Sequence, residues 1–149
     1  GRIEVTKGDR RAYDDAVLLI EENNLHDIIQ LHKPTNDILN RMNEADVVAL
    51  FSELEGLPNA ICEGMMIGKP IIMSKVSDYS VLIDNSNGLL CEWNKIESIK
   101  NAIIYMMNLK SDDLIEMGKV SKNKAEVLFS SSIILKQWVN LIEKENCDE

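Results

Sequence analysis

The residues Asp46–Phe51 (DVVALF) form a nearly continuous apolar run, which constrains the fold of this chain more than any other feature. Runs of this kind are typical of strands in parallel sheets, where helices cover both faces. A loop with the sequence SELEG follows, and Pro58 then suits the first turn of a helix that ends at Gly68. A second apolar run, Pro70–Ser74, comes next. This strand–helix–strand order predicts a parallel sheet.

The rest of the chain continues the alternation, so we expect an α/β fold with a Rossmann-like, doubly wound parallel sheet in a single domain. The other expected strands are Arg2–Lys7, Asp27–Leu31 and Gly88–Cys91. Helical spacing predicts helices over residues 10–23, 36–44, 58–67, 77–83, 95–108, 112–128 and 132–145. Their inward positions are expected to be Tyr13, Ala16, Val17, Ile20, Ile38, Met42, Ile96, Ile99, Ile103, Met106, Ile134, Trp138, Leu141 and Ile142.

The charge and cysteine content limit the classes of partner. The 149 residues include 16 Lys and Arg against 25 Asp and Glu, a net charge of −9, and this argues against nucleic acid as a partner. Three widely spaced cysteines without a CxxC pair favour reduced thiols in the cytoplasm over disulfides or zinc. No apolar run reaches the roughly 18 residues that a membrane span needs, and the start of the chain has no signal-peptide pattern.

The segment Ser52–Glu63 (SELEGLPNAICE) is the strongest candidate for a functional site. In doubly wound sheets, ligands bind beyond the carboxyl ends of the strands. Gly56 lets the backbone approach a ligand closely. The N–H groups of Leu57, Asn59 and Ala60 are expected to point outward at the start of the helix, where they and the helix dipole suit a phosphate or diphosphate.

Two carboxylates bracket this anion site. Glu55 precedes the helix, and Glu63 lies eight residues later, more than one turn into it. A carboxylate can accept two hydrogen bonds from a vicinal diol of a ribose or a hexose, so a sugar nucleotide is a plausible ligand. The alternative is that these acidic groups only stabilise the helix dipole.

The stretch SELEGLPNAICEGMMIGKPII resembles the signature of the group 1 (family 4) glycosyltransferases of the GT-B fold. In that signature, two glutamates separated by seven residues correspond to Glu55 and Glu63. The flanking segments NRMNEADVVALFS, NGLL and IESIKNAI also resemble the family, and so does the final SSSIILKQWVNLIEK. The resemblance covers nearly the whole chain.

The resemblance implies that residues 1–149 are the C-terminal, donor-binding domain of such an enzyme, with residues 131–145 as a closing helix that packs toward the partner domain. The donor would be a nucleoside-diphosphate sugar, used with a retaining outcome in polysaccharide or glycoconjugate synthesis. We expect Glu63 to hold the ribose diol and Glu55, as the catalytic residue, to hold the donor sugar. The backbone from Gly56 through Leu57, Pro58 and Asn59 to Ala60 would hold the diphosphate.

The acceptor-binding N-terminal domain has no counterpart in this sequence, so we expect the chain alone to be an inactive fragment. The full enzyme could associate peripherally with a membrane. His32 and Lys33 follow the strand expected at 27–31, where the family often contacts the base, and they are further candidate ligands. Residues 1–8 match either the first or the second strand of the family's domain. The second fits better, and the first strand, which is central in the family's sheet, would then be missing.

The sequence departs from the family's pattern in one loop, lacks a metal-binding motif, and leaves two other functions open. The loop Val76–Ser80 differs from the family's glycine-rich loop, which bears on donor specificity. No Asp-x-Asp occurs, so we expect neither a metal ion nor a cofactor. The competing readings are another GT-B enzyme, such as a sugar-nucleotide epimerase, and a non-catalytic phospho-receiver. The latter would need an aspartate at the end of the third strand, where Phe51 stands.

Overall fold

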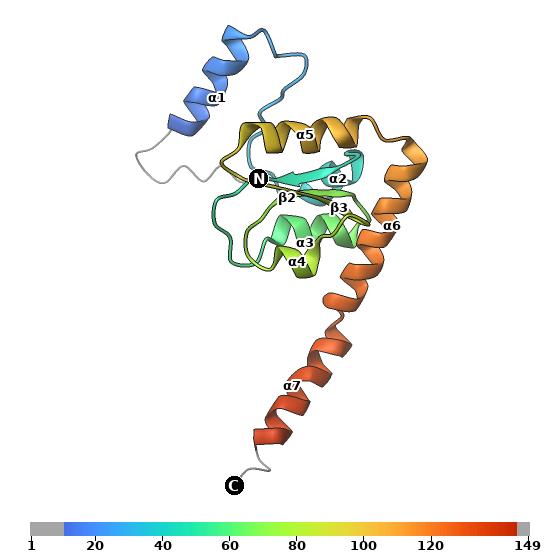
Figure 1. The fold of residues 1–149 in the computed structure, drawn as a ribbon. Helices are drawn as coiled ribbons and strands as arrows, with labels where there is room; N and C mark the ends of the chain where they lie inside the picture. Colours follow the sequence, from blue (N-terminus) through green and yellow to red (C-terminus); the bar gives the residue numbers. More distant parts are fainter. Residues whose placement is uncertain (1–10, 146–149) are drawn as a thin grey trace. The chain divides into compact units, whose positions relative to one another are not determined.

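The computed structural model describes residues 11–145 (Figure 1). These divide into two compact units, with the boundary between Ile38 and Leu39. The strand expected at Arg2–Lys7 lies outside the described residues. In the first unit, helix α1 (Arg11–Glu22) buries Ile20, as its periodicity predicts, but Tyr13, also expected to be inward, is exposed. The helix ends at two asparagines: the Asn23 side chain donates to the Leu19 carbonyl, and Asn24 has a φ of 53°.

The strand predicted at Asp27–Leu31 is wrong, because the structure has turns there. The backbone N–H groups of Ile28 and Ile29 both donate to the carbonyl of Leu25, at 2.9 and 2.8 Å. Ile28 is 78% exposed. The apolar pattern is present, but the backbone satisfies its hydrogen bonds locally instead of in a sheet.

Three parallel strands form the centre of the second unit: β1 (Val48–Leu50), β2 (Ile71–Ser74) and β3 (Gly88–Cys91), in the order β1-β2-β3 (Figure 1). The register pairs Val48 with Ile71 and Ile71 with Gly88. The middle strand β2 is buried along its whole length, and the edge strand β1 exposes Ala49. Burial on both faces is therefore complete for β2, whereas the run Asp46–Phe51, which contains β1, is only partly buried.

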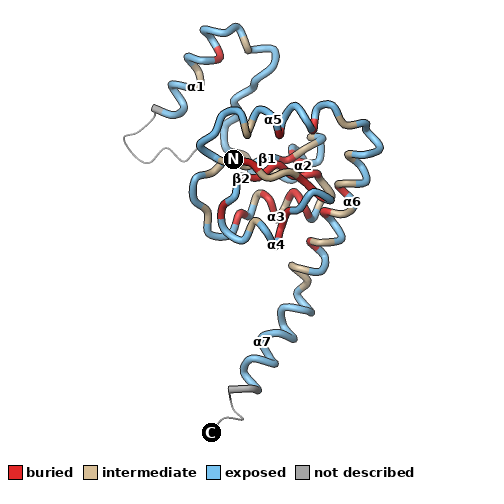
Figure 2. Tube along the Cα trace, viewed as in Figure 1, coloured by how far each residue is buried: buried red, intermediate tan, exposed pale blue. Residues whose placement is uncertain are grey.

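Helices cover both faces of this sheet, as the α/β prediction requires. Helix α5 (Ile96–Met107) lies on one face, whereas α3 (Asn59–Met66) and α4 (Tyr79–Leu82) lie on the other, and α6 (Ser111–Leu128) packs against α3 (Figure 1). The remaining helices of this unit are α2 (Ile38–Glu44) and α7 (Ser131–Glu145). Figure 2 shows that the buried residues concentrate in the strands and on α3. None of the helices within residues 11–145 combines the length and apolar content that crossing a membrane takes.

The predicted helix positions are confirmed to within two residues at each end, but several predicted inward faces are wrong. In α5, Met106 is buried, whereas Ile96 and Ile103 are exposed. In α7, every side chain from residue 131 to 143 is exposed (Figure 2). This includes all four positions expected to be inward, namely Ile134, Trp138, Leu141 and Ile142.

Two glycines set the packing of α6 against the end of α3. Gly68 follows α3 with a φ of 78°, the left-handed conformation expected for a C-terminal glycine. A Cβ at Gly118 would collide with the carbonyl oxygen of Gly68. The two backbones therefore approach more closely than any larger residue at position 118 would allow.

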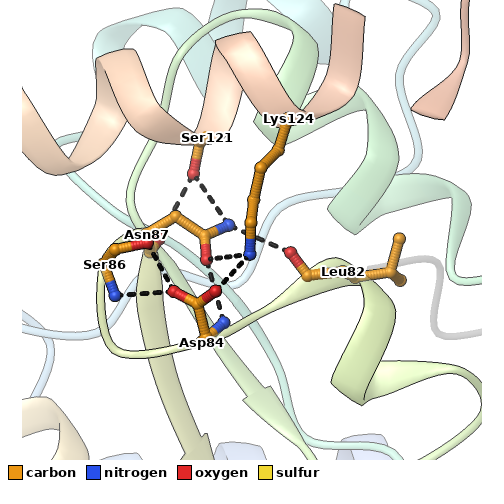
Figure 3. A network of polar contacts seen from close by, with 6 residues as sticks. All are labelled: Leu82, Asp84, Ser86, Asn87, Ser121 and Lys124. Atoms are coloured by element: carbon orange, nitrogen blue, oxygen red, sulfur yellow. Dashed lines mark hydrogen bonds and ion pairs between the residues drawn. The ribbon is translucent and has the colours of Figure 1, made fainter. Parts of the chain in front are cut away.

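A polar network holds the turn before β3 against α6 (Figure 3). The fully buried Asn87 donates from Nδ2 to the Leu82 carbonyl at 3.0 Å and accepts from the backbone N–H of Asp84 at 2.9 Å. From α6, Ser121 donates to the Asn87 carbonyl at 3.2 Å. Lys124 forms an ion pair with Asp84 at 2.6 Å. This network lies before the start of β3, at the opposite end of the strand from the carboxyl edge.

The Asp84–Lys124 pair predicts a small acid-dependent loss of stability. Lys124, and then the hydroxyl and N–H of Ser86, lower the pKa of Asp84 from 3.8 to about 2. A depressed folded-state pKa stabilises the fold above the unfolded value, and this contribution is lost as pH falls from about 4 to about 2. Asp84 is 54% exposed, so solvent screening keeps the contribution to about 1 kcal/mol or less.

The test compares urea unfolding of the wild type with that of Lys124→Met at pH 7 and at pH 2.5. We expect the variant to be less stable at pH 7 and the difference to shrink at pH 2.5. An unchanged difference would mean that the ion pair does not cause the effect.

Candidate functional site

The loops after β1 and β2 meet at the carboxyl edge of the sheet, where the sequence places the candidate site. Ser74, the last residue of β2, donates its hydroxyl hydrogen to the carbonyl oxygen of Ser52 at 2.6 Å. Three residues later, the hydroxyl of Ser77 donates to the carbonyl oxygen of Gly56. These two bonds tie the segment around Glu55 to the neighbouring strand and its loop.

The side chain of Glu55 is half-buried and held by a neighbour on its own loop. The hydroxyl of Ser52 donates to Oε1 of Glu55 at 2.6 Å. A hydrogen bond to a carboxylate is stronger than one between neutral groups. The bond engages one carboxylate oxygen, so the group is oriented while its second oxygen can still accept hydrogen bonds from a ligand.

The start of α3 differs from the prediction in one respect. The N–H of Asn59 donates to the Leu57 carbonyl at 2.9 Å, so the expectation that it points freely outward is wrong. No acceptor for the N–H of Leu57 or Ala60 lies among residues 11–145. Two of the three predicted donors thus remain for an anion, together with the helix dipole.

The other residues of this turn divide between the surface and the core. Gly56 is exposed, and a Cβ there would meet no protein atom within 4 Å, so the space beside its backbone is open to a ligand. Leu57 is 61% exposed. Pro58 has a fully buried side chain, and its carbonyl accepts hydrogen bonds from Ile61 and Cys62. The buried ring of Pro58 thus anchors the start of the helix in the core and is not available to contact a ligand.

Glu63 is half-buried and lies in the middle of α3, one turn after Asn59. Its neighbour Cys62 has a raised pKa, mainly because burial penalises the thiolate and also because the Glu63 charge repels it. A raised pKa lowers the share of thiolate, which is the reactive form, so it disfavours Cys62 as a nucleophile. The loop–helix segment thus presents two carboxylates, Glu55 and Glu63, on either side of the helix start.

An ion pair joins the ends of β2 and β3 at the same edge of the sheet. Lys75 follows β2 and Glu92 follows β3, and Nζ of Lys75 lies 2.6 Å from Oε1 of Glu92. Each group favours the charged form of the other, so the pKa of Lys75 is raised and that of Glu92 is lowered. In the part of the chain that the structure describes, no cluster of three His, Cys, Asp or Glu residues could hold a metal ion.

Two predicted ligands lie outside the loop–helix segment, and three serines that were not predicted lie in or next to it. His32 and Lys33 are exposed residues of the first unit, and their role as ligands stays a prediction. Sequence reasoning missed the hydroxyls of Ser52, Ser74 and Ser77. The available signal was that each follows or ends a predicted strand at the same edge of a parallel sheet, where side chains from adjacent strands meet.

Comparison with known proteins finds one family across most of the chain. The family "Glycosyl transferases group 1" matches residues 5–126, a range that runs through both units. The chain is similar to the putative colanic acid biosynthesis glycosyltransferase WcaL of Escherichia coli K12, with 25% identity over 134 residues, which are 84% of this chain and 33% of that protein. It is also similar to an E. coli UDP-Gal:alpha-D-GlcNAc-diphosphoundecaprenol alpha-1,3-galactosyltransferase, with 37% identity over 90 residues, which are 60% of this chain and 23% of that protein.

Solved structures agree on the fold. The Anabaena protein Alr3699/HepE in complex with UDP-glucose superimposes with a TM-score of 0.79 at 20% identity, covering 92% of this chain and 38% of that one. The three-stranded α/β fold described above thus matches the C-terminal part of GT-B glycosyltransferases. The chain spans about a third of the length of the curated relatives that it matches first.

Proposed function

Because this chain belongs to the group 1 glycosyltransferases, we propose that it binds the nucleoside-diphosphate sugar donor of a glycosyl transfer to an acceptor hydroxyl. The observation that carries the proposal is the oriented carboxylate of Glu55 beside the start of α3. A fixed carboxylate next to a helix N-terminus matches the chemistry of a sugar joined to a diphosphate. The UDP-glucose complex of the structurally similar Anabaena protein supports a donor of this class.

Each part of the segment has a proposed role. The N–H groups of Leu57 and Ala60 and the dipole of α3 would neutralise the diphosphate, which develops negative charge as it leaves. Glu63 would hold the ribose diol. Glu55 would hold hydroxyls of the donor sugar and stabilise the positive charge that develops at the anomeric carbon.

Transfer itself would take place in a protein that joins this chain to an acceptor-binding domain. The activities that the names of relatives give, in colanic acid and amylovoran synthesis, favour a polysaccharide or a glycoconjugate as the product. In such a protein the exposed apolar side chains of α7 would pack against the acceptor-binding domain. The burial of apolar area in such a contact would stabilise the arrangement of the two domains.

Thermal unfolding of the 149-residue chain with saturating ligands tests donor binding. We expect UDP-sugars or other nucleoside-diphosphate sugars to raise the melting temperature, because a ligand that binds only the folded state stabilises it by mass action. The bare nucleoside diphosphate should raise the melting temperature less. AMP and inorganic phosphate are the controls, and equal shifts with all these compounds, or none with any, would contradict the proposal.

A further inference from the structure

Three serine hydroxyls converge on the segment that carries Glu55. Ser74 donates to the carbonyl of Ser52, Ser52 donates to the carboxylate of Glu55, and Ser77 donates to the carbonyl of Gly56. The first two bonds, each of 2.6 Å, meet at Ser52, whose carbonyl accepts from Ser74 and whose hydroxyl donates to the carboxylate. The third bond holds the peptide immediately after Glu55.

Ser74, the donor to the carbonyl of Ser52, lies in the core of the sheet. Ser74 is fully buried and ends the middle strand of the sheet, which pairs with β1 on one side and β3 on the other. Its hydroxyl lies near two acceptors: the carbonyl of Ser52, on the loop after β1, and at 3.5 Å the carbonyl of Leu50, the last residue of β1. The position of Ser52 is therefore set by the core of the sheet.

The third hydroxyl is held in an unfavourable backbone conformation. Ser77 has a φ of 54°, in the left-handed region that residues with a Cβ rarely adopt. Such conformations persist only where the surrounding structure holds them, and they concentrate at functional sites. The bond to Gly56 joins the loop after β2 to the loop after β1.

From these contacts we infer that Ser52 and Ser77 are positioning residues that aim the carboxylate of Glu55 at the donor sugar. The inference rests on the proposed function and deepens it. Ser52 occupies one oxygen of Glu55 and leaves the other for a sugar hydroxyl, while Ser77 fixes the adjoining peptide. Both act through Glu55, so they affect recognition of the sugar and leave recognition of the nucleotide to α3.

The first test measures the dissociation constants of UDP-glucose and UDP by calorimetry on the 149-residue chain. Ser52→Ala is expected to weaken UDP-glucose binding by about tenfold and UDP binding by less than about twofold, because only the sugar contact loses its oriented acceptor. Ser52→Thr keeps the hydroxyl and should restore the preference for UDP-glucose. The matched control is Ser111→Ala, which removes an exposed serine hydroxyl from the start of α6.

The second test adds a measurement that is made without ligand. The ¹H–¹⁵N heteronuclear NOE of the Gly56 and Leu57 amides should fall in Ser77→Ala, which loses the hydroxyl and keeps the unfavourable φ. Ser77→Gly also loses the hydroxyl but removes the backbone strain. We expect the lowered NOE and the reduced preference for UDP-glucose in both variants, because the hydroxyl bond holds the loop. Neither change should occur in Ser111→Ala.

The outcomes separate this inference from the function on which it rests. If the wild-type chain binds neither compound, donor binding is wrong, and the positioning role is wrong with it. If the wild type prefers UDP-glucose and Ser52→Ala keeps the same ratio of dissociation constants, the positioning role is overturned while donor binding stands. Equal weakening of UDP and UDP-glucose would also overturn it, because that result indicates general damage to the fold.

Discussion

Replacing Glu55 by alanine is expected to lower the rate of sugar transfer by about 10²–10³-fold in a protein that carries this chain together with its acceptor-binding domain. The affinity for the bare nucleoside diphosphate should stay within about twofold. The reason is that a carboxylate beside the anomeric carbon interacts most strongly when positive charge develops there, so its loss raises the barrier more than it weakens the ground state. The hydrogen bond from Ser52 holds this carboxylate in place before the donor arrives.

Three measurements on one preparation decide the role of Glu55: turnover, affinity for the nucleoside diphosphate, and melting temperature. If the carboxylate only stabilises the dipole of α3, its loss costs about 0.3–1 kcal/mol of stability, and turnover stays normal. Glu53→Ala is the matched control, because Glu53 is an exposed carboxylate two residues earlier in the same loop. Normal turnover in Glu55→Ala would remove this residue from the site.

The parallel sheet could be predicted because its signals are local. The apolar runs that became β2 and β3, the helix between Pro58 and Gly68, and the glycine at the end of that helix all follow from short stretches of sequence. The loop–helix segment was predictable for the same reason, since it lies between two recognisable strands. Glu55 and Glu63 could be predicted as site residues from their spacing and from the resemblance to a family.

The errors occur where an apolar pattern needs a partner element to become buried. The run from Asp27 to Leu31 has the composition of a strand, yet its backbone closes turns on Leu25. Trp138 on α7 and Ile96 on α5 lie at correctly predicted helical positions and are exposed. A sequence pattern shows which face of a helix is apolar, but it does not show what packs against that face.

The hydroxyl bonds around Glu55 were beyond prediction for a different reason. A serine at the end of a strand can bond to its own turn, to water or to a neighbouring loop. Which of these it does depends on how the ends of β1 and β2 are placed, and that follows from the register of the sheet. The donation from Asn59 to Leu57 belongs to the same class, because the detailed conformation of a turn decides which N–H groups stay available.

The second large effect is expected at Glu63. If its carboxylate accepts both hydroxyls of the ribose diol, Glu63→Gln should weaken binding of UDP by about 1–3 kcal/mol, the scale of a hydrogen bond to an ionised group. Glutamine has nearly the same shape as glutamate but keeps only one acceptor oxygen, so the position of Glu63 within α3 should tolerate the change. The measurement is calorimetry on the 149-residue chain, with Glu53→Gln as the matched control.

A ligand that lacks the diol distinguishes a direct contact from a disturbed helix. For the 2′,3′-dideoxy analogue of UDP, the wild type and Glu63→Gln should have nearly equal affinities, because the hydroxyls that the carboxylate would accept are absent. The loss caused by the mutation and the loss caused by removing the diol should therefore not add, as for any two groups that contact each other. Additive losses would show that Glu63 acts elsewhere, and the ribose would then have to be held by a different residue.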